Sequence, residues 1–202
     1  FKKKIIEEDD FKFKILIKTD LKPSIETVFH AIIPYKIVLH SHPIDIISIA
    51  INNNAKTLLS NLLGDFDWDF IPYARPGYPV AKLIYKSLRK KKSNILILEN
   101  HGLIIGADSI NEARQLQKKV LKVFNLSTRE IQLPDIKKIE YIRNLIPNSK
   151  LPKYSEIHSL GSDDDFLKLV RKNPVYPDHI VFCGKRPFFL DPKCINLNSL
   201  KN

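Results

Sequence analysis

The sequence has little cysteine, with only Cys183 and Cys194 among its 202 residues. Two cysteines without a further ligand pattern do not form a disulfide framework, so we expect a reducing compartment. Long apolar runs are lacking too, since none reaches the roughly 18 residues of a membrane-spanning helix. The first residues are charged rather than typical of a signal peptide. These absences together predict a cytoplasmic protein that does not contact membranes.

Glycine is scarce as well, and none of the six glycines forms the G-x-G-x-x-G fingerprint that binds dinucleotides after a strand. The sequence therefore does not predict a dehydrogenase domain. An aromatic and basic RNA-binding motif, zinc-finger spacing and a helix with a basic reading face are also missing. Nucleic acid is thus not the expected partner, despite a net charge of +11. We interpret this charge as a solvated surface, with a bias toward anionic small substrates.

A chain of 202 residues, of which 44% are hydrophobic, is long enough to bury a core. We expect one domain over residues 1–150, with an extension over residues 151–202 that packs on the same domain. Strands are predicted over residues 11–18, 36–42 and 178–183 and before His101, with a loop or edge strand at residues 65–70. Helices are predicted over residues 24–33 with Ser24 as the N-cap, 43–51, 55–63, 80–91, 134–145 and 166–171, with a long helix that begins at Asp108 or Ser109 and runs to Phe124. Residues 147–161 are expected to be irregular.

The stretch from Pro23 to His42 concentrates residues that are able to perform chemistry. His40 and His42 lie two apart in an apolar, β-branched run, where alternate side chains of a strand share a face. His101 follows a second apolar run and precedes Gly102, which would let the backbone turn sharply. Three neutral imidazoles with an open position form the ligand set of a catalytic zinc site.

Other polar residues have two interpretations each. Glu26 lies in the first turn of a predicted helix, where the helix dipole favours a carboxylate, so it is either a helix-start charge or a functional acid. His30, one turn later, is interpreted as a packing or hydrogen-bonding residue. Tyr73 and Arg75 lie in a segment that two prolines and a glycine interrupt. This segment is either a surface turn or a functional loop.

Four short motifs occur in the order in which one protein family has them. They are Pro23-Ser-Ile-Glu26, His40-Ser-His-Pro43, Tyr73-Ala-Arg-Pro-Gly77 and Asn100-His-Gly-Leu103, followed by Gly106 and Glu112-Ala113. Over residues 20–125 the sequence therefore resembles the class II aldolase and adducin family. Residues 176–184 are similar to the end of the aldolase part of bifunctional rhamnulose-phosphate aldolase and short-chain dehydrogenase proteins.

The resemblance implies an α/β fold, a three-layer α/β/α sandwich with a largely antiparallel central sheet. It also implies a cyclic homotetramer with active sites between subunits. Members of the family usually begin with a helical region and a strand whose glycine-asparagine loop binds substrate phosphate. Nothing before Phe11 matches these elements, so we expect a domain that is shortened at its N-terminus.

The resemblance further implies site residues. His40, His42 and His101 would be the metal ligands, with zinc or another divalent metal as the cofactor. Glu26 would be the general acid/base, close enough to ligate the metal when substrate is absent. Tyr73 would be the family's tyrosine acid, acting in the site of the neighbouring subunit.

The implied substrate is a sugar phosphate. Ser24 matches a serine that contacts phosphate in the family, whereas Ile25 stands where sugar-phosphate aldolases often have a second hydroxyl group. Arg75 is the basic residue placed to compensate, or it is an ordinary surface arginine. We therefore expect weak phosphate binding by this chain alone.

The implied activity is that of a lyase in carbohydrate metabolism, which cleaves or forms a carbon–carbon bond in a ketose phosphate through a zinc-stabilised enediolate. Glu26 would move the proton on the enediolate carbon, and Tyr73 would handle the aldehyde oxygen. The same scaffold supports sugar-phosphate epimerisation and dehydration. A non-catalytic assembly module like the adducin head is an alternative from another class, and the intact histidines and Glu26 argue against it.

Overall fold

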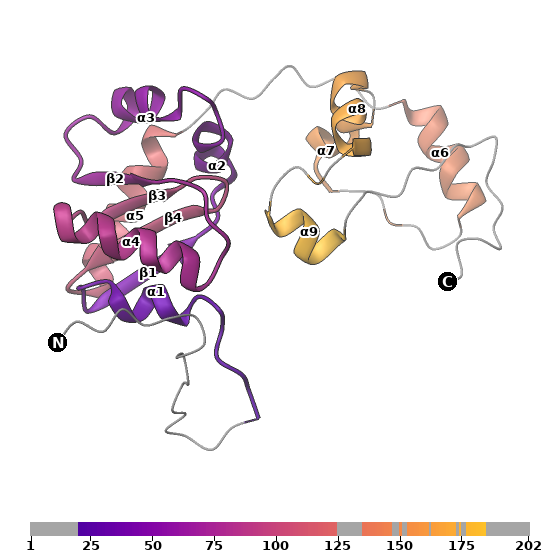
Figure 1. Ribbon diagram of the computed structural model, residues 1–202. Coiled ribbons are helices and arrows are strands. Elements are labelled where there is room, and N and C mark those ends of the chain that lie inside the picture. The colour runs from indigo at the N-terminus through magenta and orange to yellow at the C-terminus, as the bar shows by residue number, and fades with distance from the viewer. Residues whose placement is uncertain are drawn as a thin grey trace. The chain divides into compact units, whose positions relative to one another are not determined.

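The computed structural model describes residues 20–124, 135–146, 150, 153–161, 163–172, 174 and 177–184 (Figure 1). The chain divides into two compact units, Phe1–Asn125 and Leu126–Asn202, and each is described by itself. All strands of the described residues belong to the first unit. The strand predicted over residues 11–18 lies outside the described residues. The packing of residues 151–202 on the first domain stays a prediction.

Within the described residues, the central sheet has four strands in the order β1-β4-β3-β2. The strands are β1 (Ile37–Ser41), β2 (Trp68–Ile71), β3 (Ile95–Leu98) and β4 (Gly102–Ala107). β1 and β3 both pair with β4 in antiparallel orientation, whereas β2 pairs with β3 in parallel. The sheet is therefore mixed, with antiparallel pairings in the majority. Among the described strands, β2 lies at an edge of the sheet, as one of the two interpretations of residues 65–70 predicts.

Helices cover both faces of this sheet. They are α1 (Thr27–Ile32), α2 (Ile44–Ala50), α3 (Ala55–Leu63), α4 (Tyr78–Lys90) and α5 (Ile110–Val123). Because side chains alternate along a strand, Ile95 and Ile97 of β3 pack with residues of α2, α3 and α5. Leu96 and Leu98 pack with residues of α1 and α4 on the opposite face. Each fully buried side chain of this kind contributes about 1.5–3 kcal/mol of transfer free energy. Since helices pack on both faces of the sheet, the expected α/β/α sandwich is confirmed.

Local sequence signals explain two of the helix boundaries in the first unit. α3 ends at Gly64, whose φ of 44° favours glycine. At the start of α5, the Ser109 hydroxyl accepts the backbone N–H of Glu112 at 3.2 Å. α1 differs from the prediction, because a turn closed by the Thr27 N–H on the Ser24 carbonyl (3.0 Å) precedes the helix. Ser24 is therefore not the N-cap, and α1 begins directly after Glu26.

The described elements of the second unit are helices. They are α6 (Ile136–Leu145), α7 (Ser155–Leu160), α8 (Asp164–Lys172) and α9 (Pro177–Cys183). Two predictions are wrong here, since α7 lies in the segment expected to be irregular and α9 replaces the strand expected over residues 178–183. A short apolar run fits a strand or a helix by periodicity alone. Pro177 at the first helical position and Asp178 in the first turn favour the helix.

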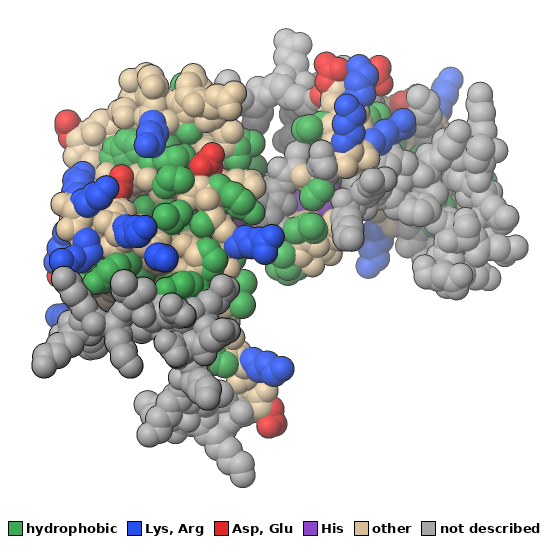
Figure 2. Space-filling view, in the orientation of Figure 1, with side chains coloured by type: hydrophobic (Ala, Val, Ile, Leu, Met, Phe, Trp, Pro, Cys, Tyr) green, Lys and Arg blue, Asp and Glu red, His purple; other side chains and the backbone are tan. Residues whose placement is uncertain are grey.

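The surface of the first unit is rich in basic side chains. On the face shown in Figure 2, Lys and Arg side chains are spread among hydrophobic and other side chains. On α4, Lys82, Lys86, Arg89 and Lys90 are all exposed. This arrangement supports the interpretation of the positive charge as a solvated surface. Among the residues that the structure describes, none of the helices is both long enough and apolar enough to cross a membrane.

Candidate metal centre

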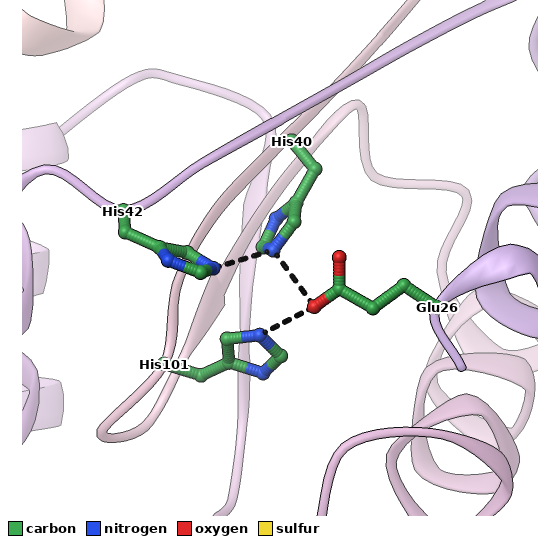
Figure 3. A group of neighbouring side chains, drawn as sticks. All are labelled: Glu26, His40, His42 and His101. Atoms are coloured by element: carbon green, nitrogen blue, oxygen red, sulfur yellow. Dashed lines mark hydrogen bonds and ion pairs between the residues drawn. The ribbon is translucent and has the colours of Figure 1, made fainter. Parts of the chain in front are cut away.

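Four side chains from separate parts of the sequence meet at one end of the sheet. Glu26 comes from the start of α1, His40 from β1, His42 from the residue just after β1, and His101 from the turn between β3 and β4. Each offers one ligand atom, and these atoms all lie within 4.8 Å of one another. Figure 3 shows the four side chains pointing toward a common centre. Residues far apart in the sequence thus form a single polar cluster.

The distances within the cluster are short. Glu26 Oε1 lies 3.0 Å from His101 Nε2 and 3.5 Å from His40 Nε2. The Nε2 atoms of His40 and His42 are 2.9 Å apart. The ring centroid of His42 lies 4.8 Å from that of His40 and 5.1 Å from that of His101. One carboxylate oxygen and three ring nitrogens therefore face a small common volume.

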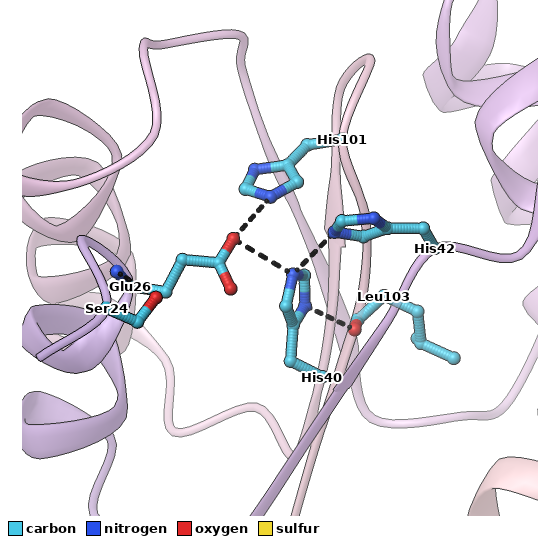
Figure 4. Close-up of polar contacts among 6 residues, drawn as sticks. All are labelled: Ser24, Glu26, His40, His42, His101 and Leu103. Carbon is cyan, nitrogen blue, oxygen red and sulfur yellow. Dashed lines mark hydrogen bonds and ion pairs between the residues drawn. The ribbon is translucent and has the colours of Figure 1, made fainter. Parts of the chain in front are cut away.

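The tautomer of His40 follows from its second ring nitrogen. His40 Nδ1 lies 3.0 Å from the Leu103 carbonyl oxygen (Figure 4). A carbonyl oxygen only accepts, so Nδ1 carries the proton and donates this bond. The Nε2 lone pair then faces the centre. Such a second hydrogen bond orients histidines that bind metals.

The protonation state of His40 also suits a ligand. Burial lowers the pKa of His40 to about 4, partly opposed by the Glu26 carboxylate and reinforced by His101. His40 is therefore neutral at pH 7, the state that metal binding requires. The ring of Phe29, which is fully buried, packs edge-on against His40 at a centroid distance of 5.2 Å and contributes to this burial.

Close backbone contact at Gly102 brings His42 and His101 together. A Cβ atom at residue 102 would overlap the Ser41 carbonyl oxygen and lie 3.0 Å from Cδ2 of His42. The sharp turn that we predicted at Gly102 lies instead at Asn100, which has a φ of 52°. Glycine is thus required at residue 102 by the approach of β1 and not by the turn.

Sequence reasoning missed the support that α5 gives to the site. Gln117 Nε2 donates to the Ser41 hydroxyl at 3.1 Å, and Ser41 is the last residue of β1, between His40 and His42. Gln117 and Ser41 are 76 residues apart in the sequence. No local pattern indicates this contact, because it arises only when α5 packs on the sheet.

The remaining predicted site residues lie outside the group of four. Tyr73 is 57% exposed, and its backbone N–H donates to Glu99 Oε2 at 2.8 Å. Arg75 is exposed in the same loop. Ser24 is exposed, and its hydroxyl accepts the backbone N–H of Glu26 at 3.2 Å. His30 stacks on Phe29 with ring centroids 4.7 Å apart, as a packing residue does.

The donor set fits a divalent transition metal. Imidazole nitrogens and a carboxylate oxygen are ligands of zinc, and three protein ligands with an open position are typical of catalytic zinc sites. The Nδ1–H tautomer of His40 and its neutral state at pH 7 also favour metal binding. Within the described parts of the chain, this is the one group of three or more such side chains able to hold a metal ion.

Comparisons with known proteins identify a family profile and several similar proteins. The profile of the Class II Aldolase and Adducin N-terminal domain matches residues 3–127. The uncharacterized oxidoreductase YuxG from Bacillus subtilis (strain 168) is 29% identical over 198 residues, which cover 84% of this chain. The chain spans only 28% of the length of YuxG.

Two solved structures are also similar. The N-terminal class II aldolase domain of a conserved protein from Thermoplasma acidophilum is 32% identical, with a TM-score of 0.46, over 50% of this chain and 46% of that chain. An aldolase II superfamily protein from Pseudomonas syringae is 18% identical, with a TM-score of 0.41, over 73% of this chain and 59% of its own. The match to the family profile covers more than half of the sequence. The chain therefore belongs to the class II aldolase and adducin family.

Proposed function

We propose that this protein is a metal-dependent lyase that cleaves or forms a carbon–carbon bond in a ketose phosphate. The observation that supports the proposal is the convergence of Glu26, His40, His42 and His101 in a member of this family. His40, His42 and His101 would hold a divalent metal ion, with zinc as the first candidate. The bound ion would supply Lewis acidity toward the substrate carbonyl.

Glu26 is the proposed general acid/base. Its Oε1 atom faces His101 and His40 at 3.0 and 3.5 Å, so the carboxylate occupies the side of the centre that no imidazole fills. Substrate would displace it from that position. The freed carboxylate would take up a proton from the substrate and return it to the reacting carbon, as general acid/base catalysis requires.

Tyr73 and the phosphate contacts complete the proposal. The Tyr73 side chain is 57% exposed and does not belong to the group of four residues at the centre. This exposure suits a proton donor that acts in the site of a neighbouring subunit, within a closed homotetramer. Ser24 and Arg75 are both exposed and would bind the substrate phosphate.

The oxidoreductase activity in the name of YuxG need not belong to the part of that protein that matches this chain. The match spans 28% of that protein, and this sequence contains no glycine-rich dinucleotide fingerprint. Epimerisation or dehydration of a sugar phosphate would use the same metal and the same acid. No feature of the described residues favours either reaction over aldol cleavage.

The test combines metal analysis with a retro-aldol cleavage assay on a panel of ketose phosphates. In Glu26→Gln the side chain keeps its shape but loses its basic carboxylate, so cleavage should fall by a factor of about 10² to 10⁴. Metal content should stay unchanged, because three imidazoles remain. Glu140→Gln, at an exposed carboxylate of α6, is the matched control and should keep full activity. An unaltered cleavage rate in Glu26→Gln would show that another residue is the general acid/base.

A further inference from the structure

We propose that Glu99 is a positioning residue that anchors the Tyr73 loop to the turn bearing His101. This inference rests on the role proposed for Tyr73. Glu99 is half-buried and lies just after β3, two residues before His101. Its Oε2 atom accepts the backbone N–H of Tyr73 at 2.8 Å. It does not belong to the metal-ligand group.

The backbone explains why a carboxylate is needed at this position. β2 and β3 form a parallel ladder that ends at the pair Ile71 and Leu98. One step further, the Glu99 N–H donates to the Ile71 carbonyl oxygen at 3.0 Å. In a regular parallel ladder, the backbone carbonyl of Glu99 would next accept the N–H of Tyr73.

The chain instead turns at Asn100, with a φ of 52°, to begin the hairpin that presents His101. The Tyr73 N–H meets the side-chain carboxylate of Glu99. The carboxylate thus continues the ladder by one bond where the backbone has turned away. A hydrogen bond to an ionised acceptor is stronger than one to a neutral acceptor.

The Tyr73 loop has few other anchors of this kind. Pro72 and Pro76 have no N–H group, and both lie between the end of β2 and the start of α4. The Arg75 carbonyl accepts the N–H of Val80 at 3.2 Å and secures the far end of the loop. Glu99 secures the near end, next to Tyr73. Tyr73 and His101 are thereby attached to the same turn.

The first test is amide hydrogen exchange by NMR on the full chain, with no substrate present. In Glu99→Ala the Tyr73 amide should exchange about tenfold faster or more, because its acceptor is gone. Glu99→Gln retains a side-chain oxygen acceptor and should restore much of the protection. The amide of Ile97, in the middle of β3, should exchange at the wild-type rate in both variants. An unchanged Tyr73 amide in Glu99→Ala would overturn the inference.

The second test separates positioning from metal binding. Glu99→Ala should lower kcat for the cleaved ketose phosphate by about tenfold while metal content stays at the wild-type level. In a Tyr73→Phe background the same substitution should cause no further loss, because it acts through Tyr73. If Glu99→Ala lowered kcat by the same factor in the wild type and in Tyr73→Phe, the inference would be overturned. If the wild-type protein cleaves no substrate, the proposed function fails, whereas the exchange experiment still decides the role of Glu99.

Discussion

At the scale of single residues, the centre depends on contacts that leave the ring nitrogens directed inward. The Leu103 carbonyl sets the tautomer of His40. The Gln117 amide contacts Ser41, and the missing side chain of Gly102 admits both Ser41 and His42. None of these groups is one of the proposed metal ligands. They determine where the proposed metal ligands lie.

Gly102→Ala should weaken metal binding without removing any ligand. The new Cβ would overlap the Ser41 carbonyl oxygen, and the end of β1 must shift, taking His42 with it. Overpacking of this kind costs about 1–3 kcal/mol of folding free energy. Metal titration and urea denaturation would measure the two effects.

The matched control is Gly161→Ala in the second unit. The nearest atom to a Cβ at Gly161 is the His158 carbonyl oxygen at 3.6 Å, an ordinary contact. This variant should bind metal as the wild type does. If Gly102→Ala bound metal equally well, close approach of β1 would not be the reason for glycine at residue 102.

Acid should destabilise the metal-free protein through His40. The folded pKa of His40 is lowered from 6.5 to about 4, so the unfolded chain binds more protons between these values. The free energy of unfolding therefore falls as the pH drops from about 6.5 to about 4, by up to about 3 kcal/mol. Urea denaturation of chelator-treated protein across this range would measure the slope. His40→Gln should show a shallower slope, and an identical slope would contradict this assignment.

At the scale of elements, the outer edge of β2 is occupied by local hydrogen bonds. The N–H of Phe70 donates to Asp69 Oδ1 at 2.8 Å, and Lys91 Nζ donates to the Trp68 carbonyl oxygen at 3.2 Å. The Trp68 N–H donates to the Phe66 carbonyl oxygen at 3.1 Å. Asp67 and Ile71, in contrast, accept bonds from residues of the β3 segment. These contacts block an edge that could otherwise pair with another strand.

The double variant Asp69→Ala with Lys91→Ala should associate beyond the wild-type state. Both substitutions release backbone groups of Trp68 and Phe70 on the open side of β2, which another chain can then bind. Light scattering as a function of protein concentration would detect the larger species. Lys90→Ala is the control, since it removes a neighbouring exposed lysine of α4 and leaves the edge contacts intact. Equal scattering by the double variant and the control would refute this role of the side chains.

At the scale of the whole molecule, metal binding should stabilise the first unit. All four residues of the centre belong to Phe1–Asn125. A ligand that binds only the folded state at a free concentration 100 times its Kd adds about 2.7 kcal/mol of stability. Calorimetry of the full chain should therefore show one transition that moves to lower temperature when a chelator is added. In His101→Ala the chelator should cause a much smaller shift, and a shift of wild-type size there would mean that the metal binds elsewhere.

The sequence determined most of the elements and singled out Glu26, His40, His42 and His101, the four residues that meet at the end of the sheet. Local patterns are sufficient where a signal lies within one turn or one strand. Examples are the spacing of His40 and His42, the glycine at residue 64 that ends α3 and the serine at residue 109 that caps α5. Local patterns were insufficient for residues 178–183, where a short apolar run fits a strand and a helix alike. Local patterns also misplaced the start of α1, because the turn before it depends on a backbone hydrogen bond from Thr27 to Ser24.

Only the tertiary structure decided how these residues work together. The antiparallel register of β1 and β4 places His40 opposite Ile104, and the hairpin at Asn100 then brings His101 beside it. The hydrogen bond from His40 to Leu103 joins residues 63 positions apart, and the hydrogen bond from Tyr73 to Glu99 joins residues 26 positions apart. Periodicity along a chain reports which face a side chain takes, but it contains no information on which distant segment packs against that face. The nearest neighbours of each proposed ligand therefore became visible only once the sheet and its helices were assembled.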